Sequence, residues 1–150
     1  MGSEWGQVLK DVISEVLETM FFAVVEFEQY ESGNHPFDYE SEIRLHNHDG
    51  EIVISLKVSE EFARMITADF LGIEQDQIKD DDIEDCMKEL ANMVGGGYHA
   101  KINDVHWRLG IPKAWRIGQD VRDTVEATAG LEFGFFGQSA GSIHFVRLPA

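Results

Sequence analysis

Apolar residues recur at intervals of three and four along three segments of the chain, which is the period of an amphipathic helix. The first segment covers residues 4–24, the second runs from Ser59 to Gly72, and the third covers residues 82–102. Ser59 can cap the start of its helix, and Gly72 is suited to end it. An N-cap for the third helix is expected among the aspartates at 80–82, whose charge also suits a helix N-terminus. The pattern therefore predicts three helices.

Runs in which apolar and polar residues alternate predict two β-hairpins. The runs are 41–45 and 51–57, joined across Asp49-Gly50, and 131–136 and 142–148, joined through 137–141. Asp-Gly between two such runs is a strong hairpin signal. A short strand is also expected at 25–27, whereas residues 113–130 have no assignable pattern. Helices mixed with antiparallel hairpins, without strict alternation of strand and helix, predict the α+β class.

Length and composition predict one soluble domain that spans residues 1–150. The chain is 43% hydrophobic and 11% aromatic, as globular domains are. Its longest apolar runs are too short to cross a bilayer, and its N-terminus is acidic where a secretory signal would be basic and then apolar. We therefore expect a cytoplasmic protein with no membrane contact. Cys86 is the only cysteine, which excludes an internal disulfide and a cysteine-rich zinc site, and we expect it to be buried.

The charge of the chain narrows the choice of partner. Its 28 acidic and 12 basic residues give a formal net charge of -16. Such a charge repels nucleic acid and anionic membranes, so neither is expected as a partner. A protein with a basic patch is a better candidate. The alternative is that the charge serves solubility alone.

One face of the third helix carries polar residues and glycine at helical spacing. Its members are Asp85, Glu89, Asn92, Gly96 and His99. Like charges four residues apart destabilise a helix slightly, and each glycine of the run 95–97 costs roughly 1 kcal/mol relative to alanine. Local rules are often broken in this way at functional sites. The face is therefore a candidate partner-binding surface. The alternative is a solvated helix face whose glycines end the helix early.

The same residues resemble the signature of a known family. The string Asp85-x-x-x-Glu89-x-x-Asn92, continued by Met93-Val94-Gly95-Gly96 and later by a Leu-Gly-Ile-Pro stretch that ends at Pro112, resembles the motif of the CheC, CheX and FliY phosphatases. Residues 16–22 are similar to the opening helix of CheX-like domains. Together with the order of helices and hairpins, the resemblance covers most of the chain.

The resemblance implies a CheC-like pseudo-symmetric fold, with two helix-plus-hairpin halves and long helices packed on an antiparallel sheet. It also implies a phosphatase that hydrolyses the aspartyl phosphate of a CheY-type response regulator in chemotaxis signalling. Asn92 would orient the attacking water and Glu89 would dock to the receiver lysine, while Asp85, Gly96 and His99 would contact the partner. No metal or cofactor is expected from this chain, because the regulator supplies Mg²⁺. A homodimer is expected from the family.

A weak internal repeat bears on the number of sites. When the first and third helices are aligned, Glu18 falls opposite Glu89 and Phe21 falls opposite Asn92. Phe21 therefore stands where the amide is needed. We expect this ring to be buried and the first helix to have no site.

Two other functions remain open from the sequence. The first is a non-catalytic module that binds a receiver without hydrolysing it. The second is a metal protein that uses His46 and His48, since residues two apart on a strand share a face and two imidazoles can bind Zn²⁺ or Ni²⁺. The Asp49-Gly50 turn that follows favours exposed histidines without a metal.

Overall fold

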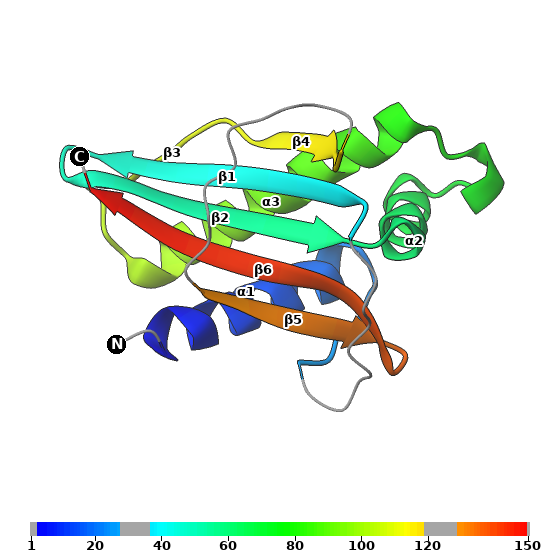
Figure 1. Cartoon of the computed structure of the whole chain (residues 1–150), viewed down its shortest axis with the longest axis horizontal. Helices are drawn as coiled ribbons and strands as arrows, with labels where there is room; N and C mark the ends of the chain where they lie inside the picture. Colours follow the sequence, from blue (N-terminus) through cyan, green and yellow to red (C-terminus); the bar gives the residue numbers. More distant parts are fainter. Residues whose placement is uncertain (1–2, 28–36, 119–128, 150) are drawn as a thin grey trace.

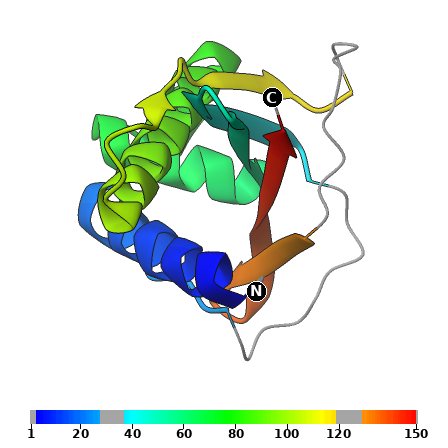
Figure 2. The ribbon, with the colours of Figure 1, turned by 90° about the vertical axis from the view of Figure 1, so that its left-hand side faces the viewer.

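The computed structural model describes residues 3–27, 37–118 and 129–149, in which three helices cover one face of an antiparallel sheet (Figures 1 and 2). The elements are α1 (Ser3–Met20), β1 (Tyr39–Asn47), β2 (Gly50–Val58), α2 (Glu60–Leu71), the 3₁₀ turn η1 (Gln75–Gln77), α3 (Asp80–Ile102), β3 (Arg108–Leu109), β4 (Lys113–Arg116), β5 (Ala129–Phe135) and β6 (Gln138–Pro149). This confirms the α+β class. None of the described helices is both long and apolar enough to span a bilayer.

The two hairpins meet in the middle of the sheet. The strand order is β3-β1-β2-β6-β5, and β4 also pairs with β1. β2 and β6 are the inner strands of the two hairpins, and Ile54 lies opposite Phe145 in their register. Because α1 precedes the β1–β2 hairpin and α3 precedes the β5–β6 hairpin, the order of elements is the predicted pair of helix-plus-hairpin halves.

Each long helix packs against the hairpin of the other half. On α1, Trp5 stacks on Phe145 of β6 with ring centroids 5.0 Å apart. On α3, Gly95 lies directly over Ile43 of β1. The hydrophobic core between the helices and the sheet therefore joins the two halves into one unit.

Two helix ends differ from the prediction. α1 ends at Met20 rather than at residue 24, because Phe22 takes a positive φ of 59° and the amide of Ala23 turns back to donate to the carbonyl of Leu17 at 2.9 Å. The N-cap of α3 is Lys79 and not one of the aspartates. Asp82 instead accepts a hydrogen bond from the Lys79 amide at 2.9 Å.

Both hairpin turns differ from the prediction. The first is shifted by one residue, and the second is shorter. The first turn is His48-Asp49, since Gly50 already pairs with Asn47. In the second hairpin, residues 138–141 belong to β6 and not to a loop, and the strand pairing passes a bulge at Phe133/Gly134. The small residues that resembled a loop are needed for packing, because a Cβ on Gly141 would lie 2.6 Å from the Lys57 carbonyl.

The expected strand at 25–27 is present only as a single bridge between Glu26 and Gly134. Of the unassigned segment, residues 113–116 form β4, too short for a periodic signal, while 119–128 lie outside the described residues. The two-residue strand β3 was not predicted either.

Candidate functional site

α3 presents the five predicted site residues on the side turned away from the sheet. The opposite side of the helix is buried and includes Ile83, Cys86, Met87, Leu90 and Val94. Asp85 and Glu89 are exposed, and Asn92, Gly96 and His99 are partly exposed. α3 runs to Ile102, so the glycines do not end the helix early. We call Asp85, Glu89, Asn92, Gly96 and His99 the α3 polar face.

Glu89 and Asn92 lie one helical turn apart on α3. Neither side chain has a hydrogen bond or an ion pair with any residue in the described part of the chain. Asp85 is held loosely, with its Oδ1 4.0 Å from Nζ of Lys88. An amide and a carboxylate without internal partners can both be offered to another molecule.

The glycine run combines packing with open space. A Cβ on Gly95 would fall 2.8 to 2.9 Å from the side chains of Ile43 and Leu109, and a Cβ on Gly97 would fall 2.8 Å from Val12. These two glycines let α3 approach the sheet and α1 closely. Gly96, between them, has nothing within 4 Å of its Cβ position. Packing therefore accounts for two of the glycines and leaves Gly96 to the exposed face.

His99 lies where α3 ends and is tied to the following loop. Its Nε2 is 3.1 Å from the carbonyl oxygen of Asp104, to which it can donate. Asn103 ends the helix in the left-handed conformation, and its amide donates to the carbonyl of His99 at 3.2 Å. His99 thus has a structural contact of its own at one end of the α3 polar face.

Phe21 is buried, as predicted from the repeat. Its ring is fully buried and stacks on Phe70 of α2 with centroids 4.9 Å apart. Glu18 is exposed on α1 but has no amide beside it at the position of Phe21. The α1 side of the repeat therefore lacks the pairing of carboxylate and amide found on α3.

Cys86 lies beneath the α3 polar face and is buried, as expected. Burial raises the pKa of its thiol to about 11, the nearby Glu89 carboxylate adds to the rise, and a hydrogen bond with Thr67 opposes it. The thiolate is the nucleophilic form of cysteine. With this pKa the Cys86 thiol stays protonated at neutral pH and does not serve as a nucleophile.

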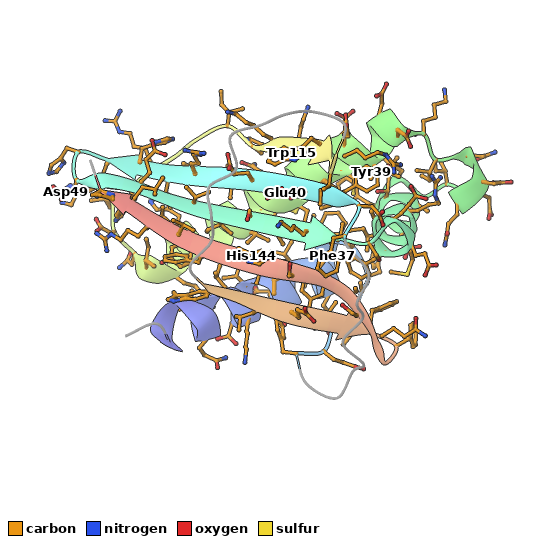
Figure 3. All side chains as sticks on the ribbon, in the orientation of Figure 1. Phe37, Tyr39, Glu40, Asp49, Trp115 and His144 are labelled. Atoms are coloured by element: carbon orange, nitrogen blue, oxygen red, sulfur yellow. The ribbon has the colours of Figure 1, made fainter. Side chains whose placement is uncertain are left out.

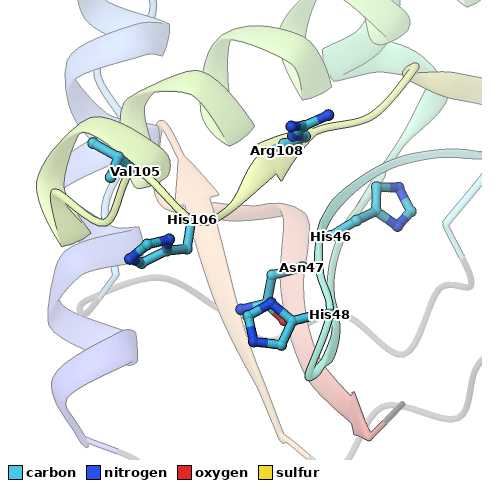
Figure 4. Close-up of a pocket in the computed structure, with 6 residues that line it drawn as sticks. All are labelled: His46, Asn47, His48, Val105, His106 and Arg108. Carbon is cyan, nitrogen blue, oxygen red and sulfur yellow. The ribbon is translucent and has the colours of Figure 1, made fainter.

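The two histidines of the metal hypothesis border a surface hollow of about 460 Å³ at the end of the β1–β2 hairpin (Figure 4). The hollow is lined by His46, Asn47, His48, Val105, His106 and Arg108. The rings of His46 and His48 lie on different sides of the hairpin in Figure 4. Within residues 3–27, 37–118 and 129–149 there is no group of three or more His, Cys, Asp or Glu residues that could hold a metal ion. The geometry does not favour the metal hypothesis.

An ion-pair cluster that sequence reasoning missed joins the starts of α2 and α3 to the sheet. Nη2 of Arg116 lies 2.7 Å from Oε1 of Glu60, 2.6 Å from the hydroxyl of Tyr39 and 3.5 Å from Oδ1 of Asp80. Tyr39 is the first residue of β1 and lies near α2 in Figure 3. Arg116 belongs to β4, a strand that the sequence pattern did not predict. The cluster becomes visible only once β4 is paired with β1, where Arg116 lies opposite Tyr39. Because Arg116 contacts the first residues of α2, α3 and β1, the cluster holds both helices against the sheet.

The sheet face opposite the helices carries titratable groups of its own, among them Glu40 and His144 (Figure 3). Burial raises the pKa of Glu40 and lowers the pKa of His144. His144 Nε2 lies 2.8 Å from Oγ of Ser142, and Lys57 neighbours both Glu40 and His144. Because helices cover the other side of the sheet, these groups are separate from the α3 polar face.

An α+β scaffold of two helix-and-hairpin halves, with an exposed carboxylate and amide one turn apart on its longest described helix, defines a CheC-like domain. The family profile described as "Chemotaxis phosphatase CheX" matches residues 45–129, more than half of the 150 residues. The chain therefore belongs to the CheX family. A search of curated proteins found no match.

Solved structures of CheX proteins share this fold. The chemotaxis protein CheX from Vibrio vulnificus is 19% identical with a TM-score of 0.72, over 93% of this chain and 95% of that one. CheX from Desulfovibrio desulfuricans is 17% identical with a TM-score of 0.72, over 96% and 99%. CheX in the CheX-CheY-BeF3-Mg complex from Borrelia burgdorferi is 13% identical with a TM-score of 0.71, over 95% and 96%.

Proposed function

We propose that this protein hydrolyses the aspartyl phosphate of a CheY-type response regulator in chemotaxis signalling. The observation that carries the proposal is the pair of Glu89 and Asn92, exposed or partly exposed one turn apart on α3 and without partners in the described residues. Membership of the CheX family and the likeness to a CheX protein solved together with CheY support the class of substrate.

The proposed reaction needs a water molecule in line with the phosphorus, and little else from this chain. A receiver carries the acyl phosphate beside its own Mg²⁺ and lysine, so catalysis is mostly positioning and electrostatics. The water oxygen forms a bond to phosphorus as the bond from phosphorus to the aspartate oxygen breaks. The products are inorganic phosphate and the free carboxylate, and the water gives up a proton.

Asn92 is suited to orient that water. A carboxamide accepts a hydrogen bond through its oxygen while it donates another through its nitrogen. The oxygen of Asn92 can therefore accept from the attacking water while the amide nitrogen donates to a group of the receiver. Its position on a helix fixes the side chain better than a loop would.

Glu89 is assigned to docking, through an ion pair with the receiver lysine. Glu89 lies one helical turn from Asn92. An ion pair between Glu89 and the receiver lysine therefore fixes the angle at which the Asn92 amide enters the receiver site. The competing role is that of a general base. The exposed position of Glu89 favours docking, because a partner can reach its carboxylate directly.

The rest of the α3 polar face is assigned to partner contact. Asp85 adds negative charge beside Glu89, and Gly96 leaves space for a partner's backbone. His99 contributes from the end of the helix. Mg²⁺ is expected from the regulator and not from this chain. Organisation as one domain and homodimerisation stay predictions.

The test mixes the protein with phosphorylated candidate receivers and follows loss of the phosphoryl group. The parent should accelerate the loss, and Asn92→Ala should lower the rate by about a hundredfold or more, the scale for one positioned hydrogen-bonding group. Binding of Asn92→Ala to a receiver loaded with a phosphate mimic should be nearly intact. If Asn92→Ala hydrolyses as fast as the parent, the catalytic assignment fails. Binding without hydrolysis by the parent would favour the non-catalytic module.

A further inference from the structure

The chain leaves α1 with one aromatic side chain turned outward between two buried residues. Phe21 and Ala23 are both fully buried, whereas Phe22 between them is 71% exposed. The amides of Phe21 and Ala23 both donate to the Leu17 carbonyl, at 3.2 and 2.9 Å. This reversal brings Phe21 and Ala23 into the core and gives Phe22 its φ of 59°.

The fold requires this backbone conformation but does not require phenylalanine in it. Glycine and asparagine adopt positive φ at little cost, and a bulky residue there is an outlier. The mostly exposed ring of Phe22 gains little from packing against its own chain. Strain of this kind collects at functional sites. The identity of residue 22 therefore points to a contact outside this chain.

The end of α1 is level, along the two helices, with the proposed catalytic pair. α1 and α3 run antiparallel in Figure 1, and Val12 of α1 lies against Gly97 of α3. Met20 is eight residues after Val12, and Glu89 is eight residues before Gly97, so both are about 12 Å along the helices from that contact. Met20 is thus level with Glu89, and Phe22 comes just beyond it.

Three apolar side chains at this end of α1 are exposed. Met20 is 43% exposed, Phe22 71% and Val24 65%. We call Met20, Phe22 and Val24 the α1 apolar rim. Exposed apolar side chains that gather beside polar ones are typical of protein interfaces, and aromatic residues carry much of the binding energy there.

We propose that the α1 apolar rim is a docking contact for the receiver, one that rests on the function proposed above. The receiver would present an apolar surface next to its lysine and phosphorylated aspartate. Because the end of α1 is level with Glu89, a partner that pairs with Glu89 can extend over Met20 and Phe22. A second copy of this chain seated on the rim would cover Glu89 as well, which is incompatible with the proposed activity.

The experiment replaces Phe22 with a residue that suits its backbone. Phe22→Asn should weaken binding to a receiver loaded with beryllofluoride and Mg²⁺ by about tenfold or more. In turnover, KM should rise while kcat stays near that of the parent, because Phe22 does not touch the phosphoryl group. The thermal midpoint should be unchanged or raised, since asparagine relieves the strain at positive φ. Opposite effects on binding and stability separate docking from a structural role.

The control is Phe22→Leu, which keeps an apolar side chain at the same backbone position. Phe22→Leu should bind the receiver more tightly than Phe22→Asn does. An equal loss in both variants would overturn the assignment to the rim.

Three further results contradict the proposal. The first is that Phe22→Asn binds the receiver as tightly as the parent. The second is a clear fall in the thermal midpoint of Phe22→Asn, which would make Phe22 a structural residue. The third is a dimer that the substitution dissociates in sedimentation while receiver binding is unchanged, which would make a second copy the occupant. If the parent binds the receiver without hydrolysing it and Phe22→Asn weakens binding, the docking proposal stands while the proposed catalytic function fails.

Discussion

Gly95 of α3 lies directly against the side chain of Ile43 on β1. A Cβ at position 95 would fall 2.8 Å from Cγ1 and 2.9 Å from Cγ2 of Ile43, and 2.9 Å from Cδ1 of Leu109. The next residue, Gly96, has nothing within 4 Å of the same position. Two adjacent glycines of one helix thus differ in whether the fold needs them.

Alanine substitutions at these two positions should change stability in opposite directions. Gly95→Ala should lower the free energy of unfolding by roughly 1 to 3 kcal/mol, because overpacking outweighs the gain in helix propensity. Gly96→Ala should raise it by up to about 1 kcal/mol, because only the propensity changes. Urea denaturation monitored by circular dichroism measures both. Equal effects of the two substitutions would contradict the packing argument.

Phe21→Asn should destabilise the fold by roughly 2 to 4 kcal/mol without adding activity, because it removes a buried ring and buries an amide. The substitution restores the amide that the repeat lacks, so it also tests whether α1 could serve as a second site. Phe21→Leu is the matched control, since it keeps an apolar side chain. The single-site assignment is wrong if Phe21→Asn leaves stability unchanged and raises the rate of dephosphorylation.

Strong periodicity and capping chemistry predicted the larger part of the fold. The helix from Glu60 to Leu71 begins after Ser59, whose Oγ accepts a hydrogen bond from the Phe62 amide at 3.2 Å, and ends at Gly72 in the left-handed conformation. α3 was also foreseen, because a long run of one period leaves little ambiguity, and both hairpins were foreseen because two alternating runs flank turn-forming residues. Elements that depend on long-range pairing were not foreseen. β3 and β4 are too short to carry a pattern and exist because β1 offers them a partner.

The candidate site was predictable in its placement and not in its surroundings. Helical spacing was enough to put Glu89 and Asn92 on one exposed face, as the structure has them. Their functional roles stay predictions. The apolar pattern predicts a helix that extends to residue 24 and includes Phe22. The outward turn of Phe22 could therefore not be predicted. That turn depends on the simultaneous burial of Phe21 and Ala23, which only the tertiary structure specifies.

Cys86 should make stability depend on pH in alkaline solution. The thiol ordinarily titrates with a pKa of 9.0, and the fold raises this pKa to about 11. Below pH 9 both states hold the proton. Above it the unfolded chain releases the proton first, so stability falls as the pH rises toward 11, by roughly 2 to 3 kcal/mol in total. Urea denaturation at pH 8 and pH 10.5 checks this.

Cys86→Ala supplies the control for the pH series, because tyrosine and lysine also titrate in this range. The alanine variant should lose less stability between pH 8 and pH 10.5 than the parent does. An identical loss in both proteins would mean that burial does not hold the thiol proton. In the native parent at pH 8, a thiol reagent should also label Cys86 far more slowly than in urea.

Glu89 separates docking from general-base catalysis through the effect of salt. Glu89→Ala removes an exposed side chain and should leave the free energy of unfolding within about 0.5 kcal/mol of the parent. If Glu89 pairs with the receiver lysine, the substitution should weaken binding to a receiver loaded with a phosphate mimic. The loss should be greatest at low ionic strength, because salt already screens the pair in the parent. A general base would instead leave binding intact and lower kcat alone.

Glu89→Gln completes this comparison, because it keeps the shape of the side chain and removes its charge. The glutamine variant should bind as weakly as the alanine variant at low salt, and the salt dependence of binding should be reduced in both. Titrations of the three proteins with the same receiver at low and high salt measure this directly. If both variants bind like the parent at every ionic strength while turnover is lost, the docking role is wrong and Glu89 acts on the water. That outcome would leave Asn92 as the positioning group and transfer the receiver contact to the rest of the α3 polar face.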